Sequence, residues 1–289
     1  MEKTLWFLLL SIMPFEALSA ESYDNLPGSN IQLQYPLVLV HGIAAHDRAG
    51  YDAFWGAIPQ MVQDQGIPVY LGNTDAWGTY ESNAQILKNT IERVLAETHA
   101  EKVNIIAHSK GGLDSRYFIW RYDFGDRVAS LTTISTPHLG TELADLAYGA
   151  PVTHSFLARM VLQNIGKNIG DHSPNFYLVL RQLTTEFMDI FNREVLPDER
   201  VYYQRFSCSM NSPWEEPPYF FLYLYIRRVS GANDGMVSRA STQWGPHQVA
   251  ILSSLSHRDV IDWGRKLATD IDVPGLYASI LRELGRQGF

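Results

Sequence analysis

Three side chains of the types used in nucleophilic catalysis follow one another along the chain in an order that suits acyl transfer. Ser109 lies in the segment Ala107-His108-Ser109-Lys110-Gly111-Gly112, directly after an apolar run and before a segment that can form a helix. A serine at a tight turn between a strand and a helix projects its hydroxyl from the sheet, and small residues around it leave room for the turn. The pattern therefore predicts that Ser109 is a nucleophile.

A serine hydroxyl becomes a good nucleophile when an imidazole accepts its proton and a carboxylate orients that imidazole. For the order serine, acid, histidine, five of the nine histidines follow the serine: His138, His154, His172, His247 and His257. His257 follows an apolar run and a polar loop, so we expect it at the carboxyl end of a strand, where such sheets hold their sites. Asp234 precedes it in the turn Asn233-Asp234-Gly235, after another apolar run. We therefore expect Asp234 to be the acid and His257 the base.

Acyl transfer also needs backbone N–H donors where negative charge develops on the carbonyl oxygen. One donor is expected from the residue after the nucleophile, which is Lys110. The other is expected from the loop after an earlier strand, and His41-Gly42-Ile43 ends such a run. We therefore predict the N–H groups of Ile43 and Lys110 as the oxyanion donors.

The single cysteine, Cys208, is an alternative nucleophile. It lies between Ser207 and Ser209, and no glycine-rich turn nearby could form an oxyanion pocket. We interpret Cys208 as a structural residue. Because one cysteine cannot form an intramolecular disulfide, the stability of the chain must come from packing.

These residues must be positioned by strands and helices that alternate along the chain. Strands are expected at the apolar runs 35–40, 69–71, 103–107, 128–134, 201–206, 221–229 and 249–252. Helices are expected at 54–65, 82–98 and 113–122. This alternation predicts an α/β fold with a mostly parallel central sheet flanked by helices.

Strand signals stop over residues 141–198, and a mostly helical insertion takes their place. Within it Phe156, Met160 and Val161 fall on one face of an amphipathic helix. A helix packed on the core and a helix that covers the site are both compatible with this pattern.

Composition and the N-terminal segment bound the class of protein. With 289 residues, 46% hydrophobic and 19% charged, the chain has a globular balance, and its net charge of −8 without a basic cluster argues against nucleic acid as a partner. Residues 1–20 combine Lys3, an apolar run and small residues before Glu21, which predicts a secretory signal peptide too short to span a membrane. An N-terminal anchor or a buried helix is the alternative. We expect a single domain over 21–289, no transmembrane span, and a secreted or periplasmic location.

With these residues in place, the chain resembles the secreted bacterial triacylglycerol lipases of the Pseudomonas and Burkholderia type, which have the α/β-hydrolase fold. The segments that carry the resemblance are Tyr35–Ile43, Val103–Tyr117, Val128–Gly140 and Asn233–Arg239. The resemblance implies Ser109, Asp234 and His257 as nucleophile, acid and base, with the Ile43 and Lys110 amides as oxyanion donors. It also implies that the insertion is a mobile lid that opens at a lipid surface, with Phe156, Met160 and Val161 on its substrate side.

The same resemblance bears on cofactors and partners. Family members commonly hold a structural calcium beside the histidine loop, and Asp259 matches one ligand position, while the second acid has no clear counterpart. The chemistry itself needs no cofactor. The family often has a disulfide near the acid and the histidine, which the single cysteine excludes here. We expect a monomer that acts on lipid esters at an oil–water interface, with a folding chaperone as a further partner to consider.

The leading hypothesis is therefore a triacylglycerol lipase that works through an acyl-enzyme. A carboxylesterase or a phospholipase with the same triad is the alternative within the enzymes. A non-catalytic lipid-binding protein on a hydrolase scaffold is the alternative from another class.

Overall fold

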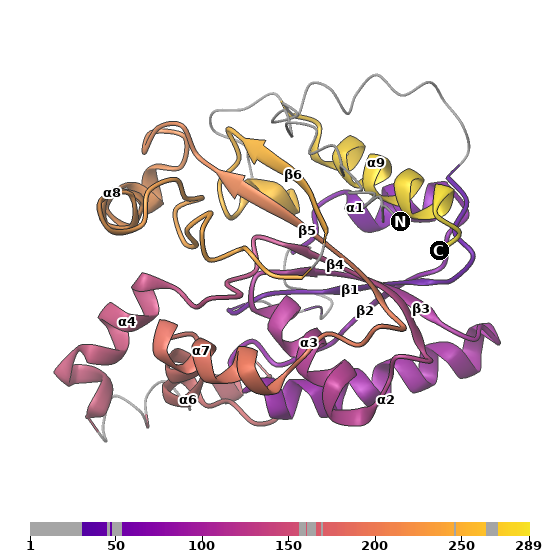
Figure 1. Ribbon diagram of the computed structural model, residues 1–289, viewed down its shortest axis with the longest axis horizontal. Helices are drawn as coiled ribbons and strands as arrows, with labels where there is room; N and C mark the ends of the chain where they lie inside the picture. Colours follow the sequence, from indigo (N-terminus) through magenta and orange to yellow (C-terminus); the bar gives the residue numbers. More distant parts are fainter. Residues whose placement is uncertain are drawn as a thin grey trace, which may run out of the picture.

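A parallel sheet forms the centre of the protein (Figure 1). The structure, a computed structural model, describes residues 31–44, 47, 54–155, 160, 166–168, 170–245, 247–263 and 271–289. Six strands are ordered β2-β1-β3-β4-β5-β6, and every neighbouring pair is parallel. The strands are β1 (Leu37–Val40), β2 (Val69–Leu71), β3 (Val103–His108), β4 (Val128–Ile134), β5 (Tyr202–Ser209) and β6 (His247–Ser253). The predicted α/β fold with a mostly parallel sheet is confirmed.

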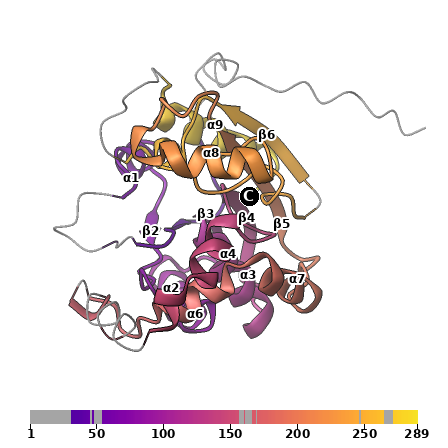
Figure 2. The ribbon, with the colours of Figure 1, turned by 90° about the vertical axis from the view of Figure 1, so that its left-hand side faces the viewer.

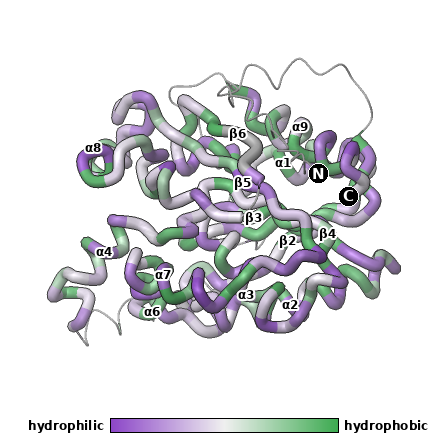
Figure 3. Tube along the Cα trace, in the orientation of Figure 1, coloured by the Kyte–Doolittle hydropathy of each residue, from purple (hydrophilic) through white to green (hydrophobic). Residues whose placement is uncertain are grey.

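Helices cover both faces of this sheet. The covering helices are α1 (Ile58–Asp64) and α9 (Val273–Arg286) on one face, above the sheet in Figure 1, and α2 (Tyr80–Thr98) and α3 (Lys110–Tyr122) on the other. Successive side chains of a strand point to opposite faces, so β1 supplies both layers. Leu37 and Leu39 pack with α1 and α9, whereas Val38 and Val40 pack with α2 and α3. In Figure 3 hydrophobic and hydrophilic residues alternate along α9 and α2, as expected of helices with one buried face.

Because all six strands run the same way, their carboxyl ends meet at one end of the sheet, on the left in Figure 1. The loops after β1, β3 and β6 carry Ile43, Ser109 and His257. These three residues are therefore brought to the same end of the molecule, where open α/β sheets hold their sites.

The described part of the insertion lies at this same end and is helical. Its elements are α4 (Glu142–Gly149), the 3₁₀ turn η2 (Pro151–His154), α6 (Phe176–Gln182) and α7 (Thr185–Glu194). Leu183 and Phe191 of the insertion pack with Tyr80 of α2 and Leu113 of α3 in a cluster of their own. The insertion is thus anchored on the helices that flank the nucleophile.

Several predictions fall on residues that are not described. Phe156, Val161 and the predicted signal peptide at 1–20 lie outside the described residues. Met160, the third residue predicted on the substrate side of the lid, is described and has an exposed fraction of 52%. Within the described ranges, no helix is both long and apolar enough to cross a membrane.

The prediction of a strand at 221–229 is wrong, because this segment forms α8 (Phe220–Val229). The run of aromatic and branched residues has a high strand propensity, but propensity yields to tertiary packing. Only Tyr223 and Ile226 of the helix are buried, at a spacing that suits a helix, and Phe221 has an exposed fraction of 81%. The 3₁₀ turn η3 (Pro217–Tyr219) leads directly into the helix.

Candidate active site

Ser109 lies at a sharp turn between β3 and α3. Its backbone angles, φ 54° and ψ −132°, are rare for a residue other than glycine and are typical of functional sites. The turn depends on glycines packed around it: a Cβ on Gly42 would lie 2.8 Å from the Ser109 Cβ, and a Cβ on Gly111 would lie 2.4 Å from the carbonyl oxygen of His41. The small residues of the motif therefore permit the turn that the sequence predicts.

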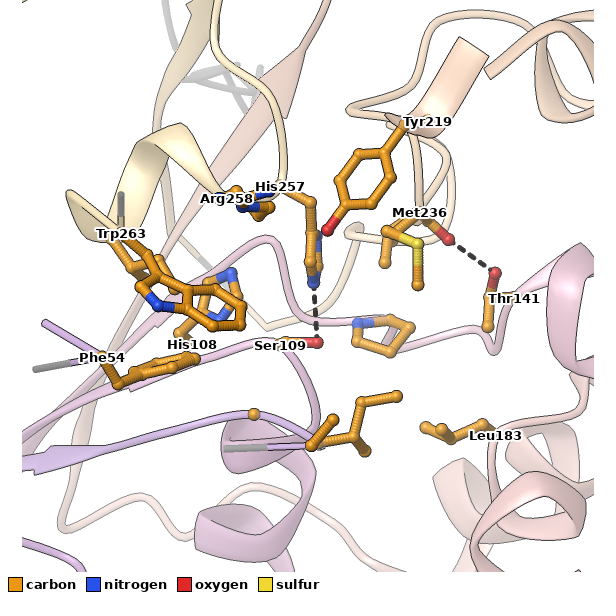
Figure 4. Close-up of a pocket in the computed structure, with 16 residues that line it drawn as sticks. Phe54, His108, Ser109, Thr141, Leu183, Tyr219, Met236, His257, Arg258 and Trp263 are labelled. Atoms are coloured by element: carbon orange, nitrogen blue, oxygen red, sulfur yellow. Dashed lines mark hydrogen bonds between the residues drawn. The ribbon is translucent and has the colours of Figure 1, made fainter. Parts of the chain in front are cut away.

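Ser109, His257 and Asp234 form one line of hydrogen bonds, and Figure 4 shows the bond between Ser109 and His257. The Ser109 hydroxyl lies 2.9 Å from Nε2 of His257, and Nδ1 of His257 lies 2.8 Å from Oδ2 of Asp234. All three residues are buried, Asp234 almost completely. The structure thus brings together the three side chains that the sequence singles out, in the geometry in which a base can accept the serine proton.

A tight turn holds the Asp234 carboxylate toward the imidazole. Its Oδ1 accepts hydrogen bonds from the N–H groups of Met236 at 3.0 Å and Val237 at 2.8 Å, which leaves Oδ2 for the histidine. Oδ1 of Asn233 accepts from the N–H of Gly235 at 2.9 Å. Gly235 has φ 93°, a left-handed conformation that favours glycine. Asp234 therefore follows a helix and lies in an Asx-stabilised turn, whereas the sequence predicted a strand end.

Two backbone N–H groups are free beside the serine. Among the described residues, the N–H of Ile43 and the N–H of Lys110 have no hydrogen-bond partner. Lys110 is the first residue of α3, where a helix leaves its N–H groups unsatisfied. The loop that carries Ile43 is held by a bond of 3.1 Å from the N–H of Ala44 to the carbonyl of Ala76. Both groups are available to a developing oxyanion.

A buried polar network supports the nucleophile turn. The Lys110 ammonium lies 2.5 Å from Oδ1 of Asp114, and both side chains are at most 3% exposed. Oδ2 of Asp114 accepts from Nδ2 of Asn83 at 2.8 Å, and Asn83 bonds the backbone N–H and C=O of Asp75. Burial raises the pKa of the Asp114 carboxyl, while the Lys110 charge lowers it. The network ties the start of α3 to α2 and to the loop after β2.

The insertion is joined to this loop by two buried carboxylates. Asp171 accepts from the N–H groups of Ala76 at 2.8 Å and Trp77 at 2.9 Å. Asp75 accepts in turn from the N–H of His172 at 2.9 Å. Ala76 also accepts the hydrogen bond that holds the loop of Ile43. The segment of Ala76 and Trp77 therefore links Asp171 of the insertion to one of the two oxyanion donors.

His108 forms part of the wall of the site and packs against His257. Its ring centroid lies 4.5 Å from that of His257 and 5.8 Å from that of Phe54. Burial, together with the nearby His257, lowers the pKa of His108 well below its usual value. The His108 imidazole that packs against His257 is therefore neutral.

An apolar pocket opens above the serine hydroxyl, and Figure 4 shows the residues around it. Its apolar wall is formed by Ile43, Leu183, Met236, Val237 and Trp263. A hydroxyl nucleophile, an oriented base, free N–H donors and an apolar wall are the parts needed to transfer an acyl group from an apolar ester.

Comparisons with known proteins agree with this chemistry. A profile described as palmitoyl protein thioesterase matches residues 36–180, half of the chain. A triacylglycerol lipase of Vibrio cholerae is 40% identical over 79% of this chain and 78% of its own. Triacylglycerol lipase 2 of Saccharomyces cerevisiae is 30% identical over 82% of this chain and 74% of its own. The chain belongs to the triacylglycerol lipase family. It is a carboxylic ester hydrolase of the α/β-hydrolase type.

The lipase fold is also seen among solved structures. The Staphylococcus hyicus lipase superposes with a TM-score of 0.71 at 18% identity, over 90% of this chain and 98% of that one. This structure shows the shared fold, and the Vibrio cholerae relative confirms the predicted resemblance to bacterial triacylglycerol lipases.

The calcium ligand expected of this lipase has other bonds. Asp259 is buried at the start of the 3₁₀ turn η4 (Asp259–Ile261), and its Oδ2 accepts from the N–H of Ser256 at 3.2 Å. The nearby Glu216 lies 3.5 Å from an Arg258 nitrogen. In the part of the chain that the structure describes, no group of three or more His, Cys, Asp or Glu side chains is placed to hold a metal ion. Calcium also takes backbone carbonyl and water oxygens, so calcium at Asp259 stays a prediction.

Sequence reasoning missed several residues of the lipase site. Tyr219, Leu183 and Trp263 line the pocket but come from segments without a catalytic pattern. Asp171 was missed because its bond partners lie more than ninety residues earlier in the chain. Cys208 is buried in β5, and burial raises the pKa of its thiol, which agrees with a structural residue.

Proposed function

We propose that this lipase hydrolyses triacylglycerols through a covalent acyl-enzyme on Ser109. The observation that carries the proposal is the line of two hydrogen bonds, 2.9 Å and 2.8 Å long, from Ser109 through His257 to Asp234. A buried carboxylate on Nδ1 keeps Nε2 as the proton acceptor, which is the tautomer that the reaction requires.

The reaction then has two halves. Nε2 of His257 accepts the Ser109 proton as the hydroxyl oxygen attacks the ester carbonyl, and the N–H groups of Ile43 and Lys110 hold the oxyanion. The tetrahedral species collapses when His257 gives its proton to the leaving alcohol, which departs as a diacylglycerol. A water molecule, deprotonated by His257, then attacks the acyl-enzyme. His257 returns this proton to the Ser109 oxygen as the second tetrahedral species collapses, and the fatty acid is released.

The apolar pocket supports an acyl group as the transferred group. Its walls from Leu183, Met236 and Trp263 would bury methylene groups, each of which contributes about 0.8 kcal/mol. We also propose that the insertion acts as a lid over this pocket. Support comes from Leu183 of the insertion, which lines the pocket, and from the exposed Met160.

A thioester is the second candidate substrate, because the profile matched by residues 36–180 is that of palmitoyl protein thioesterase. The same nucleophile, base and oxyanion donors serve a thioester. Carboxylesterase and phospholipase activity use these groups too, so substrate comparison must separate the four.

The test compares release of acid from emulsified triolein, a dissolved short-chain ester, phosphatidylcholine and a palmitoyl thioester, for the parent and for Ser109→Ala. We expect the highest rate on the emulsion and its loss in the variant. A rate confined to the dissolved ester would make the protein an esterase, and a preference for the thioester or for phosphatidylcholine would overturn the triacylglycerol assignment. Equal rates in parent and variant would exclude Ser109 as the nucleophile.

We propose in addition that the lipase is exported, with residues 1–20 as the signal peptide. The charged start, apolar run and small residues at 17–20 support this. N-terminal sequencing of protein recovered outside the cytoplasm should give Glu21 as the first residue, whereas recovery of an intact Met1 would contradict it.

A further inference from the structure

We propose that α8 and the loop before it form a docking surface for a lipid droplet whose surface carries fatty-acid carboxylates. This inference rests on the proposed function, because such carboxylates are the product of the reaction. The docking surface is defined by Trp214, Phe221, Leu224, Arg227 and Arg228.

The apolar part of the docking surface faces solvent. Tyr223 and Ile226 are the buried residues of α8, so the opposite face is turned outward. Phe221, with an exposed fraction of 81%, and Leu224, at 43%, lie three residues apart on that outward face. Trp214 of the preceding loop is 70% exposed, and its ring packs on Phe220 with centroids 4.7 Å apart. Large apolar side chains grouped in this way mark an interaction surface.

The docking surface adjoins the mouth of the acyl pocket. Tyr219, the residue before α8, lines the pocket, and its side chain lies beside His257 in Figure 4. In Figures 1 and 2, α8 lies at the same end of the sheet as α4 of the insertion, and the two helices contact each other. A lipid surface that contacts α8 is therefore next to the opening through which an ester enters and a fatty acid leaves.

Charge favours an anionic lipid surface as the occupant. Arg227 and Arg228 are both exposed in the last turn of α8, although the whole chain carries a net charge of −8. Guanidinium groups bind carboxylates with two parallel hydrogen bonds. Aromatic and aliphatic side chains bordered by arginine are typical of helices that lie in a lipid–water interface. A droplet on which hydrolysis has begun presents both an apolar interior and surface carboxylates.

The test measures flotation of the catalytically inactive Ser109→Ala protein with triolein droplets coated by phosphatidylcholine, with and without oleate, at alkaline pH. Adding Phe221→Ser and Leu224→Ser should weaken binding to both droplets by about tenfold for each side chain, from the loss of apolar burial. Adding Arg227→Gln and Arg228→Gln should weaken binding by about fivefold for each charge, and only on droplets with oleate. Salt should reduce the oleate-dependent part alone.

Leu196→Ser is the matched control. Leu196 is 61% exposed and precedes the start of β5, at the end of the sheet away from the site. It should leave binding unchanged. Equal binding of the α8 variants and this control would overturn the proposal. So would a dimer of the parent that the α8 changes dissociate, with droplet binding unaffected, because the surface would then bind a second copy.

The α8 variants also separate this inference from the proposed function. In the Ser109 background, all of them should hydrolyse a dissolved short-chain ester at the parental rate, since none of the changed residues touches the reacting atoms. Absence of activity of the parent on emulsified triolein would refute the proposed function, whereas the flotation assay does not depend on turnover.

Discussion

The buried pair of Lys110 and Asp114 gives a quantitative test of how the nucleophile turn is held. The two side chains are at most 3% exposed, and their charged atoms lie 2.5 Å apart. Removing one partner of such a pair costs about 3–5 kcal/mol, because the other charge stays buried without compensation. Asp114→Asn keeps the shape of the side chain and removes its charge, so we expect it to lower the free energy of unfolding by about 3 kcal/mol or more.

The opposite variant, Lys110→Met, should behave differently with pH. Burial already raises the pKa of the Asp114 carboxyl, and loss of the ammonium removes the charge that lowers it. The folded protein then binds a proton more readily than the unfolded chain. The free energy of unfolding of Lys110→Met should therefore be nearest to that of the parent at acid pH. It should fall relative to the parent as pH rises from the pKa of Asp114 in the unfolded chain through its raised pKa in the folded protein.

The double variant Lys110→Met with Asp114→Asn completes the cycle. It leaves no buried charge, and Asn83 keeps the carbonyl of Asp75 as an acceptor at 3.0 Å. We expect the double variant to be within about 2 kcal/mol of the parent, and so more stable than Asp114→Asn. Urea unfolding followed by circular dichroism measures all four proteins. Additive losses, or a loss below about 1 kcal/mol in Asp114→Asn, would refute the account of the pair as a mutually compensated buried unit.

Three further predictions concern other parts of the site. Asp171→Asn should lower kcat on a dissolved ester by about tenfold with little change in KM, because one of the Ala76 and Trp77 N–H groups loses its acceptor and the Ile43 loop shifts; an unchanged kcat would show that the link does not reach the oxyanion donors. Gly42→Ala should reduce kcat by about a hundredfold in a folded protein, because its Cβ would lie 2.8 Å from the Ser109 Cβ; full activity would contradict the packing described. Burial, and then the Arg116 charge, lowers the pKa of His138 well below its usual value. The contribution of the neutral His138 to stability is therefore complete above the unfolded pKa of about 6.5, and it is lost as pH falls below that value. Below pH of about 6.5, the free energy of unfolding of His138→Asn should therefore fall with decreasing pH by up to about 1.4 kcal/mol less per pH unit than that of the parent. Urea unfolding at several pH values measures this, and parallel dependences of the two free energies on pH would refute it.

The nucleophile turn could be predicted because it depends on neighbours in the chain. A buried strand, a serine and two glycines specify the turn at Ser109 locally, and the apolar runs at 103–107 and 128–134 fit a strand of a parallel sheet and little else. The order of serine, acid and histidine then selected Asp234 and His257 from several alternatives, and their side chains meet in the structure.

The parts that escaped prediction depend on tertiary packing. The segment 221–229 combines strand-forming residues with a helical spacing of its two buried residues, and only the position of Tyr223 and Ile226 against the rest of the protein decides for the helix. The bonds of Asp171 to Ala76 and Trp77 join segments whose sequences carry no common pattern. Lys110 and Asp114 stand four residues apart, as many exposed helical pairs do, and the sequence does not reveal that they are buried.

The central claim is that His257, oriented by Asp234, activates the hydroxyl of Ser109, which attacks the ester. Its most direct test is the intact mass of the protein after reaction with a fluorophosphonate, followed by peptide mapping of the adduct. The account predicts one adduct per chain, on Ser109, with a labelling rate that falls by several orders of magnitude in His257→Ala while the protein remains folded. An adduct on another residue, or an unchanged rate without the imidazole, would contradict it.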